Sequence, residues 1–237
     1  MNNIFNPDNK FFSFMGRVAD LMILNLLCIV CCIPVVTAGP AIAAMYYITL
    51  KMARNEESYV VKGFFHSFKQ NLKQGIVIQI IMLLLGIVLA FDLYFCRMMS
   101  GQGAVYRIFS YIFVAALFVY AMLFLWIYPV LAKFFNTTRN LFRNSILMSI
   151  RHLPYTLLMA VITLIPFAVF FVPNVRAQSL LFMVLILFGI SLEAFINGHF
   201  LVKIFDNYIP ADADTQDTDL QNGNSAETSS AENDHTV

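Results

Sequence analysis

The stretch CCIPVVTAGPAIAAMYYITLKMAR, residues 31–54, decides how the rest of the chain is arranged. An apolar run meets Pro34, Thr37, Gly39 and Pro40, and a second, shorter apolar run follows. Pro and Gly mark turns between apolar segments. The stretch therefore predicts either one membrane crossing or a hairpin whose second helix returns at once. The choice fixes the side of the membrane on which every later segment lies.

The composition is that of a membrane protein. Of 237 residues, 59% are hydrophobic and only 12% are charged, whereas soluble domains are about 25% charged. Nearly uncharged windows long enough to span the hydrocarbon layer, about 30 Å thick, recur along the chain. The composition predicts an all-α polytopic protein with five long spans and one short one, at residues 17–36, 39–53, 76–95, 108–132, 155–172 and 180–201.

The distribution of basic residues favours six crossings. If residues 39–53 return the chain, only Arg97, Arg107 and Arg176 of the 15 basic residues lie outside. Five crossings would put more cations outside, against the positive-inside rule. We therefore predict a multi-pass protein of the cell membrane with both termini in the cytoplasm. The alternatives are signal-peptidase cleavage after residue 38 and a re-entrant segment at residues 39–53.

The C-terminal tail differs in composition from the rest. No Lys or Arg follows Lys203, and most of the 14 acidic residues lie beyond residue 205. Because the tail is rich in polar residues and poor in large apolar ones, it cannot bury enough surface to offset the entropy of ordering. We predict a membrane domain at residues 1–205 and a disordered acidic tail at residues 206–237.

Four cysteines occur, at Cys28, Cys31, Cys32 and Cys96. Three share one apolar segment with no nearby His, so the spacing does not indicate a zinc site. We expect no metal and no cofactor. The cysteines are either small apolar packing residues or, for Cys32 and Cys96, partners in a disulfide bond.

Two cytoplasmic loops are basic and amphipathic. In residues 60–75, VVKGFFHSFKQNLKQG, we expect one face to hold Val61, Phe64, Phe65, Phe68 and Leu72 and the other Lys62, Lys69 and Lys73. In residues 139–154, RNLFRNSILMSIRHLP, the expected apolar stripe is Phe142, Ile146, Ile150 and Leu153, and the cations are Arg139, Arg143 and Arg151. Such helices lie at the membrane interface, with their cations facing anionic lipid or a protein partner. The alternative is a pair of solvated basic connectors.

Four polar residues within the spans are candidates for a functional cavity, because such residues are costly in lipid and usually face protein or water. They are Asp20, Asn25, Glu193 and Asn197. A cavity formed by them would bind a solute or relay a proton. The alternative is structural, with Asp20 paired to Arg17 and Glu193 satisfied by a neighbouring helix. Gly39 with Ala43 is also typical of close helix packing.

The block FFSFMGRVADLMILNLLCIVCCIPVVTAGPAIAAMYY, followed by GFFHSFKQNLKQG and a span ending in FDLYF, resembles the YesL-like family of bacterial integral membrane proteins. That family is catalogued as domain of unknown function 624, and the similarity covers most of residues 10–205. The family has no established activity. Its genes often lie beside carbohydrate-utilisation and sugar ABC-transporter genes, so the resemblance implies a link to carbohydrate uptake and to ABC-transporter subunits as partners.

No enzyme motif is present: the sequence lacks H-E-x-x-H, G-x-S-x-G and the phosphate-binding G-x-x-x-x-G-K-[ST]. We therefore expect no enzymatic activity. Nucleic-acid binding is also not expected, because the basic residues lie where the positive-inside rule places them. The functional hypothesis is an accessory or permease-like component of carbohydrate uptake. The alternative is a membrane scaffold or regulatory protein that moves no solute.

Overall fold

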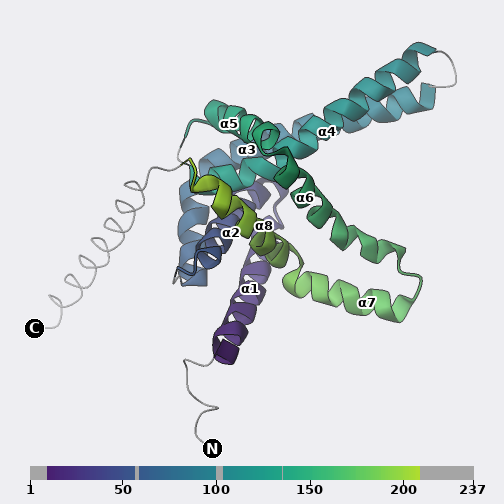
Figure 1. Cartoon of the computed structure of the whole chain (residues 1–237). Coiled ribbons are helices and arrows are strands. Elements are labelled where there is room, and N and C mark those ends of the chain that lie inside the picture. The colour runs from purple at the N-terminus through teal and green to yellow at the C-terminus, as the bar shows by residue number, and fades with distance from the viewer. Residues whose placement is uncertain (1–9, 57–58, 100–103, 135, 209–237) are drawn as a thin grey trace, which may run out of the picture. The chain divides into compact units, whose positions relative to one another are not determined.

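A computed structural model describes residues 10–56, 59–99, 104–134 and 136–208, and within these ranges every regular element is helical (Figure 1). The elements, in chain order, are α1 Lys10–Cys32, η1 Val35–Thr37, α2 Ala38–Ala53, α3 Val60–Met99, α4 Ala104–Lys133, α5 Thr138–Arg151, α6 Leu153–Leu164, η2 Ile165–Phe171, α7 Val175–Val184, η3 Leu185–Gly189 and α8 Ile190–Phe205. The chain divides into two compact units, Met1–His199 and Phe200–Val237. In the second, the described part is the end of α8 and a short turn.

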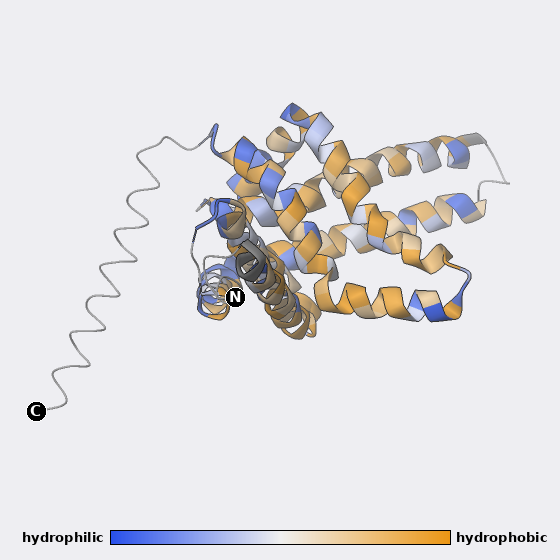
Figure 2. Cartoon of the chain, turned by 60° about the horizontal axis from the view of Figure 1, so that its bottom comes forward, coloured by the Kyte–Doolittle hydropathy of each residue, from blue (hydrophilic) through white to orange (hydrophobic). Residues whose placement is uncertain are grey.

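Six helical segments are long and apolar enough to cross a membrane. They are Phe14–Cys32, Val35–Ala53, Val60–Met99, Val105–Lys133, Leu153–Phe171 and Val175–Phe205. The predicted all-α polytopic fold is thus confirmed. Figure 2 shows hydrophobic residues along most of the helical length and hydrophilic ones mainly near helix ends. The predicted acidic tail lies outside the described residues from residue 209 onward.

The opening stretch forms a helical hairpin. Helix α1 ends at Cys32, and Pro34 leads into the 3-10 turn η1, from which α2 starts. The Thr37 hydroxyl donates to the carbonyl oxygens of Cys31 (2.6 Å) and Pro34 (2.8 Å), so it satisfies carbonyls left free where α1 ends. At the other end of the hairpin, Arg17 Nη2 donates to Asn55 Oδ1 at 2.8 Å. The chain therefore turns and comes straight back.

The short helix α2 is the most enclosed of the six spans. In its most apolar window 61% of the residues are buried, against 11–22% in the other five. It contacts α1, α3 and α4, and Gly198 of α8 lies against the Thr49 carbonyl. At 1.5 Å per residue α2 is only about 24 Å long. Because its neighbours cover it, its ends need not meet lipid.

Helices α2 and α3 cross with their backbones almost in contact. A Cβ built on Gly39 would lie 2.5 Å from the Gly75 carbonyl oxygen, and one built on Gly75 would lie 2.8 Å from Pro40 N. No side chain larger than hydrogen fits at either position. In lipid the hydrophobic effect does not drive helices together, so membrane helices associate through close van der Waals packing at such small residues.

The first basic loop is not a separate interfacial helix. It is the beginning of α3, which runs for 40 residues without a break, a length of about 60 Å. The span predicted at residues 76–95 is its distal part, which runs beside α4 (Figure 1). The second basic loop does form its own helix, α5.

The buried faces of these two segments differ from the expected apolar stripes. In α3 the buried residues include Phe64, Ser67 and Asn71, while Val61 and Phe65 are exposed. In the second segment the buried residues of α5 are Leu141, Ser145, Met148 and Ser149, while Ile150 and Leu153 are exposed. Small polar residues therefore face protein. The apolar stripes were predicted to face the membrane interface rather than protein, so the exposure of these apolar side chains does not contradict them, and the interfacial position stays a prediction.

Trp126, the single tryptophan, fixes the junction of α4 with α5 and α6. Its side chain is fully buried, and its Nε1 donates to Thr156 Oγ1 at 2.9 Å. The His152 ring, between α5 and α6, stacks on it with ring centroids 6.4 Å apart. Partial burial and the charge of Arg151 lower the pKa of His152.

The first prediction concerns the α2–α3 crossing. We expect Gly75→Ala to destabilise the fold by about 1–3 kcal/mol, because the added methyl would force the two helices apart. The measurement is thermal unfolding in detergent followed by circular dichroism. Gly16→Ala in α1 is the control, since nothing lies within 4 Å of a Cβ there. Equal melting temperatures for the two variants would contradict the close contact of the two helices.

The second prediction uses Trp126 as a reporter of His152. Because the protonated imidazole quenches indole fluorescence, we expect the emission to fall on acidification. The midpoint should lie below the usual histidine pKa of about 6.5, since the pKa of His152 is lowered. His152→Phe should abolish the change, while His199→Phe should leave it. A transition that persists in His152→Phe would show that another group causes it.

Candidate functional site

The last span contains a π-turn, η3, whose backbone groups are satisfied by α1. Asn25 Nδ2 donates to the Ile186 carbonyl oxygen at 2.6 Å, and Asn25 Oδ1 accepts from Ser191 N at 2.9 Å. The Ser191 hydroxyl donates to the Leu21 carbonyl oxygen at 2.8 Å. A π-turn breaks the regular i→i−4 pattern, and here the Asn25 amide replaces the missing partners. Asn25 and Ser191 are both fully buried.

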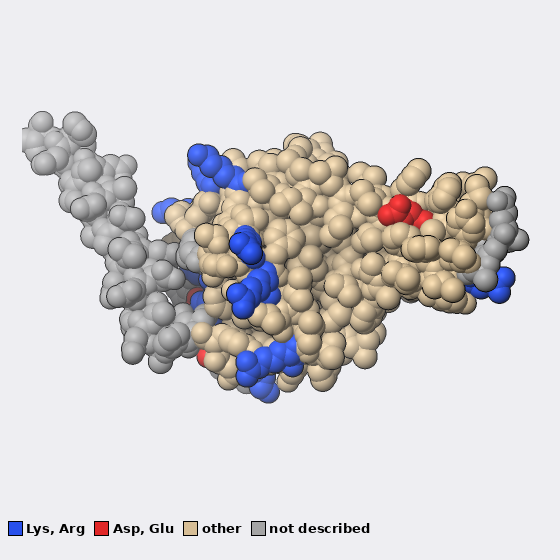
Figure 3. Space-filling view, turned by 90° about the horizontal axis from the view of Figure 1, so that it is seen from above, with Lys and Arg blue, Asp and Glu red and all other residues tan. Residues whose placement is uncertain are grey.

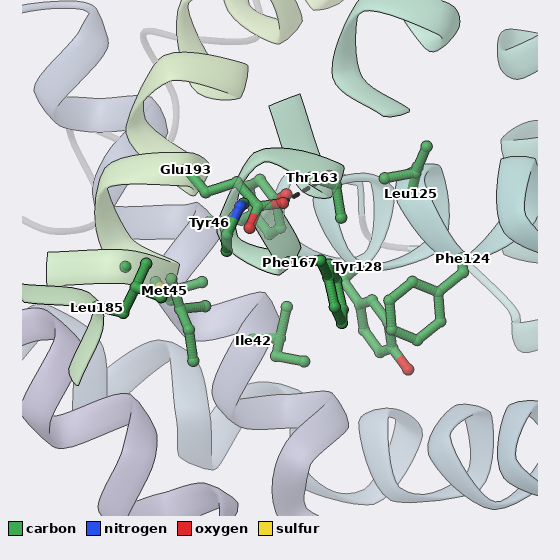
Figure 4. A pocket seen from close by; sticks show the side chains of 13 residues that line it. Ile42, Met45, Tyr46, Phe124, Leu125, Tyr128, Thr163, Phe167, Leu185 and Glu193 are labelled. Atoms are coloured by element: carbon green, nitrogen blue, oxygen red, sulfur yellow. Dashed lines mark hydrogen bonds between the residues drawn. The ribbon is translucent and has the colours of Figure 1, made fainter. Parts of the chain in front are cut away.

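Beyond the π-turn, Glu193 faces a cavity of about 350 Å³. Thr163 Oγ1 donates to Glu193 Oε1 at 2.6 Å (Figure 4). Helix α6 ends at Leu164, just before Pro166, and the 3-10 segment η2 continues the span. Proline cannot donate a backbone hydrogen bond and disfavours the regular helix. Thr163 and Phe167 therefore lie on either side of the point where the α-helix α6 passes into the 3-10 helix η2.

Most of the cavity wall is apolar and aromatic. Tyr46 comes from α2, Phe124 and Tyr128 from α4, and Phe167 from η2. The rings of Phe124 and Tyr128 meet edge to face, with centroids 5.3 Å apart. The Tyr128 hydroxyl donates to Gln79 Oε1 at 2.6 Å. Figure 4 shows the Glu193 carboxyl directed towards Thr163 and the rings of Phe124, Phe167 and Tyr128 grouped on one side.

Of the four polar residues predicted to share a cavity, only Glu193 lines this one. Asn25 is engaged by the π-turn. Asn197 is fully buried beside the Tyr46 hydroxyl, and its amide makes no hydrogen bond of regular geometry with the described residues. Asp20 lies half-buried in α1. The alternative pairing of Asp20 with Arg17 is not formed, since Arg17 binds Asn55.

Thr163 is the functional candidate that the sequence patterns did not single out. It is one of two threonines in the otherwise apolar residues 155–172, and a hydroxyl three residues before Pro166 was an available signal. The four cysteines, all within the described residues, are free, so the alternative Cys32–Cys96 bond is not formed. Among the described residues, no group of three or more His, Cys, Asp or Glu side chains could hold a metal ion.

The cations of the two basic segments are exposed on α3 and α5. Those of α3 are Lys62, Lys69 and Lys73, and those of α5 are Arg139, Arg143 and Arg151; all are exposed. Gln74 of α3 joins the two segments, since its Nε2 donates to the Asn136 carbonyl oxygen at 2.6 Å, just before α5 starts. Figure 3 shows Lys and Arg gathered mainly towards one end of the visible face, with a few at the other. We call these six residues the cationic surface.

One protein family matches part of the chain. Residues 21–93 match the family model described as "Protein of unknown function, DUF624". The chain is thus similar to this family over about a third of its length. The predicted resemblance is confirmed over these residues, which hold Asn25, the α2–α3 crossing and the α3 part of the cationic surface. Glu193, Thr163 and α5 lie outside the matched segment. Neither a curated protein nor a solved structure matches the chain significantly.

The third prediction contrasts two buried asparagines. Asn25→Leu should destabilise the fold by about 2–4 kcal/mol, because it leaves Ile186 O and Ser191 N unpaired in the π-turn. Asn197→Leu should cost much less, because its amide lies beside Tyr46 but makes no hydrogen bond of regular geometry with the described residues. Thermal unfolding in the same detergent compares them. Similar losses from both changes would contradict the different bonding of the two amides.

Proposed function

We propose that the protein is a non-enzymatic accessory component of carbohydrate uptake, which binds a subunit of a sugar ABC transporter at the cytoplasmic face. The observation that carries this proposal is the cationic surface. Its six exposed cations lie on α3 and α5, and a hydrogen bond from Gln74 of α3 to the Asn136 carbonyl oxygen links α3 to the residues just before α5. The carbohydrate link itself rests on the family resemblance.

The regular spacing of the lysines favours a protein partner over nonspecific electrostatic attraction to lipid headgroups. Lys62, Lys69 and Lys73 fall on one stripe of a helix, at spacings of about two turns and one turn. The opposite side of this segment is packed through Phe64 and Ser67. These lysines are thus carried by a helix whose other side is packed, which suits charge-complementary docking. Their concentration at one end supports a cytoplasmic position, since positive residues accumulate there.

The cavity supports an accessory role rather than transport of sugar by this chain. A sugar needs many hydrogen-bonding groups, because each buried hydroxyl without a partner costs free energy. The cavity wall offers mainly the Glu193 carboxyl and the hydroxyls of Thr163, Tyr46 and Tyr128, and Tyr128 is already bound to Gln79. Most of the remaining wall is hydrocarbon.

The fourth prediction tests docking. Affinity purification of the tagged protein from its native membrane in mild detergent, with mass spectrometry, should recover a sugar ABC permease or its ATPase. The triple change Lys69→Gln, Arg143→Gln and Arg151→Gln should reduce that recovery at least about tenfold, because charge pairs at an interface contribute on the order of 1.5 kcal/mol or more each.

The matched control is Arg97→Gln, Arg107→Gln and Arg176→Gln, which removes three exposed cations from the other ends of the spans. It should recover the partner as the unchanged protein does. Equal loss from both triple variants would exclude a specific role for the cationic surface. A protein that is recovered without a stoichiometric partner would refute docking, and a partner unrelated to transport would favour the scaffold function.

A further inference from the structure

The Glu193 cavity is not closed off from the surface of the bundle. A larger groove of about 1000 Å³ runs between α4 and α6, along residues 117–125 and 153–164. Phe124, Leu125 and Thr163 line both the groove and the cavity. The two spaces are therefore neighbours, and an apolar group in the groove would contact three side chains that also line the Glu193 cavity.

The residues that line the cavity and the groove include one acidic side chain and no basic one. Glu193 is the only acidic residue among the residues that line the cavity or the groove, and none of those residues is Lys, Arg or His. Its carboxyl accepts one hydrogen bond, from Thr163. A carboxylate in apolar surroundings is costly unless a cation or further donors accompany it. The residues described around the cavity supply no such cation.

The aromatic rings that line the same cavity favour a cationic ligand as well. Phe124, Tyr128 and Phe167 present aromatic faces and edges to the cavity. The face of an aromatic ring attracts an organic cation, more strongly when the cation is shielded from water. A neutral apolar molecule would leave the carboxyl unpaired, and an anionic one would be repelled. A small inorganic cation would use the few oxygen atoms of the wall but would gain nothing from the hydrocarbon that makes up most of it.

We propose that this cavity binds an amphiphilic organic cation, with its positive nitrogen beside the Glu193 carboxyl and its apolar body along the rings and the α4–α6 groove. Recognition combines one charge pair with apolar burial, which is the usual balance in small-molecule sites. The site is separate from the cationic surface and does not depend on docking of a transporter subunit.

The test compares two probes of the same shape. Phenyltrimethylammonium carries a fixed positive charge, and tert-butylbenzene is its neutral isostere. Equilibrium binding of labelled phenyltrimethylammonium is measured on the purified full chain in dodecyl maltoside, with empty micelles subtracted. We expect saturable binding that tert-butylbenzene, at equal free concentration, displaces at least about tenfold more weakly than unlabelled cation, as loss of one charged contact implies.

Glu193→Gln should weaken binding of the cation at least about tenfold and leave binding of the isostere unchanged. Asp20→Asn is the matched control, because it removes a half-buried carboxyl of α1 that lies outside the cavity wall. It should bind the cation as the unchanged protein does. If Glu193→Gln fails to fold, the probe comparison on the unchanged protein decides alone. Absence of saturable binding, equal affinity for both probes, or equal loss in both variants would overturn the proposal.

Discussion

The close approach of α2 and α3 at Gly39 and Gly75 is the constraint on which the other helices depend. In lipid, apolar side chains gain little by leaving their surroundings, so helices associate through backbone approach and interhelical hydrogen bonds. At the crossing, a Cβ on Gly39 would lie only 2.5 Å from the Gly75 carbonyl oxygen. This approach draws α3 onto a helix of only 16 residues. The same helix also contacts α1 and α4, so it forms the centre of the first unit.

The π-turn η3, which contacts α1, has a comparable role in the last span. One extra residue in a helical turn rotates everything that follows it by about 100° relative to a regular helix. Residues after η3 are therefore redirected, and Glu193 comes to face Thr163. The backbone groups freed by the turn would be costly in apolar surroundings. Asn25 of α1 offsets that cost by bonding to Ile186 O and Ser191 N, and the Ser191 hydroxyl in turn donates to Leu21 O of α1.

Spans and the hairpin were predictable because each depends on local signals. Apolar length marks a span, and Pro34 with Gly39 marks a turn. The continuity of α3 was not predictable, because an interfacial helix and a spanning helix have the same backbone and no proline separates them. The faces that pack against protein were not predicted either. Ser67 and Ser145 pack against protein, where small polar side chains suit close helix contacts, although their polarity suggests the opposite face. The Thr163–Glu193 contact joins residues 30 apart, and no local pattern reveals it.

Asn25 and Glu193 show two different ways of keeping a polar side chain among apolar helices. Both amide atoms of Asn25 are used by the backbone of η3 and the start of α8, so replacing it with an apolar residue would leave those groups exposed to hydrocarbon. Glu193 makes a single bond to a side chain, and a glutamine would keep it at a lower cost of desolvation. The charge of Glu193 therefore contributes little that the fold requires. The desolvation of this charge is unfavourable for folding, so we explain the presence of Glu193 by the cation that its carboxylate would bind.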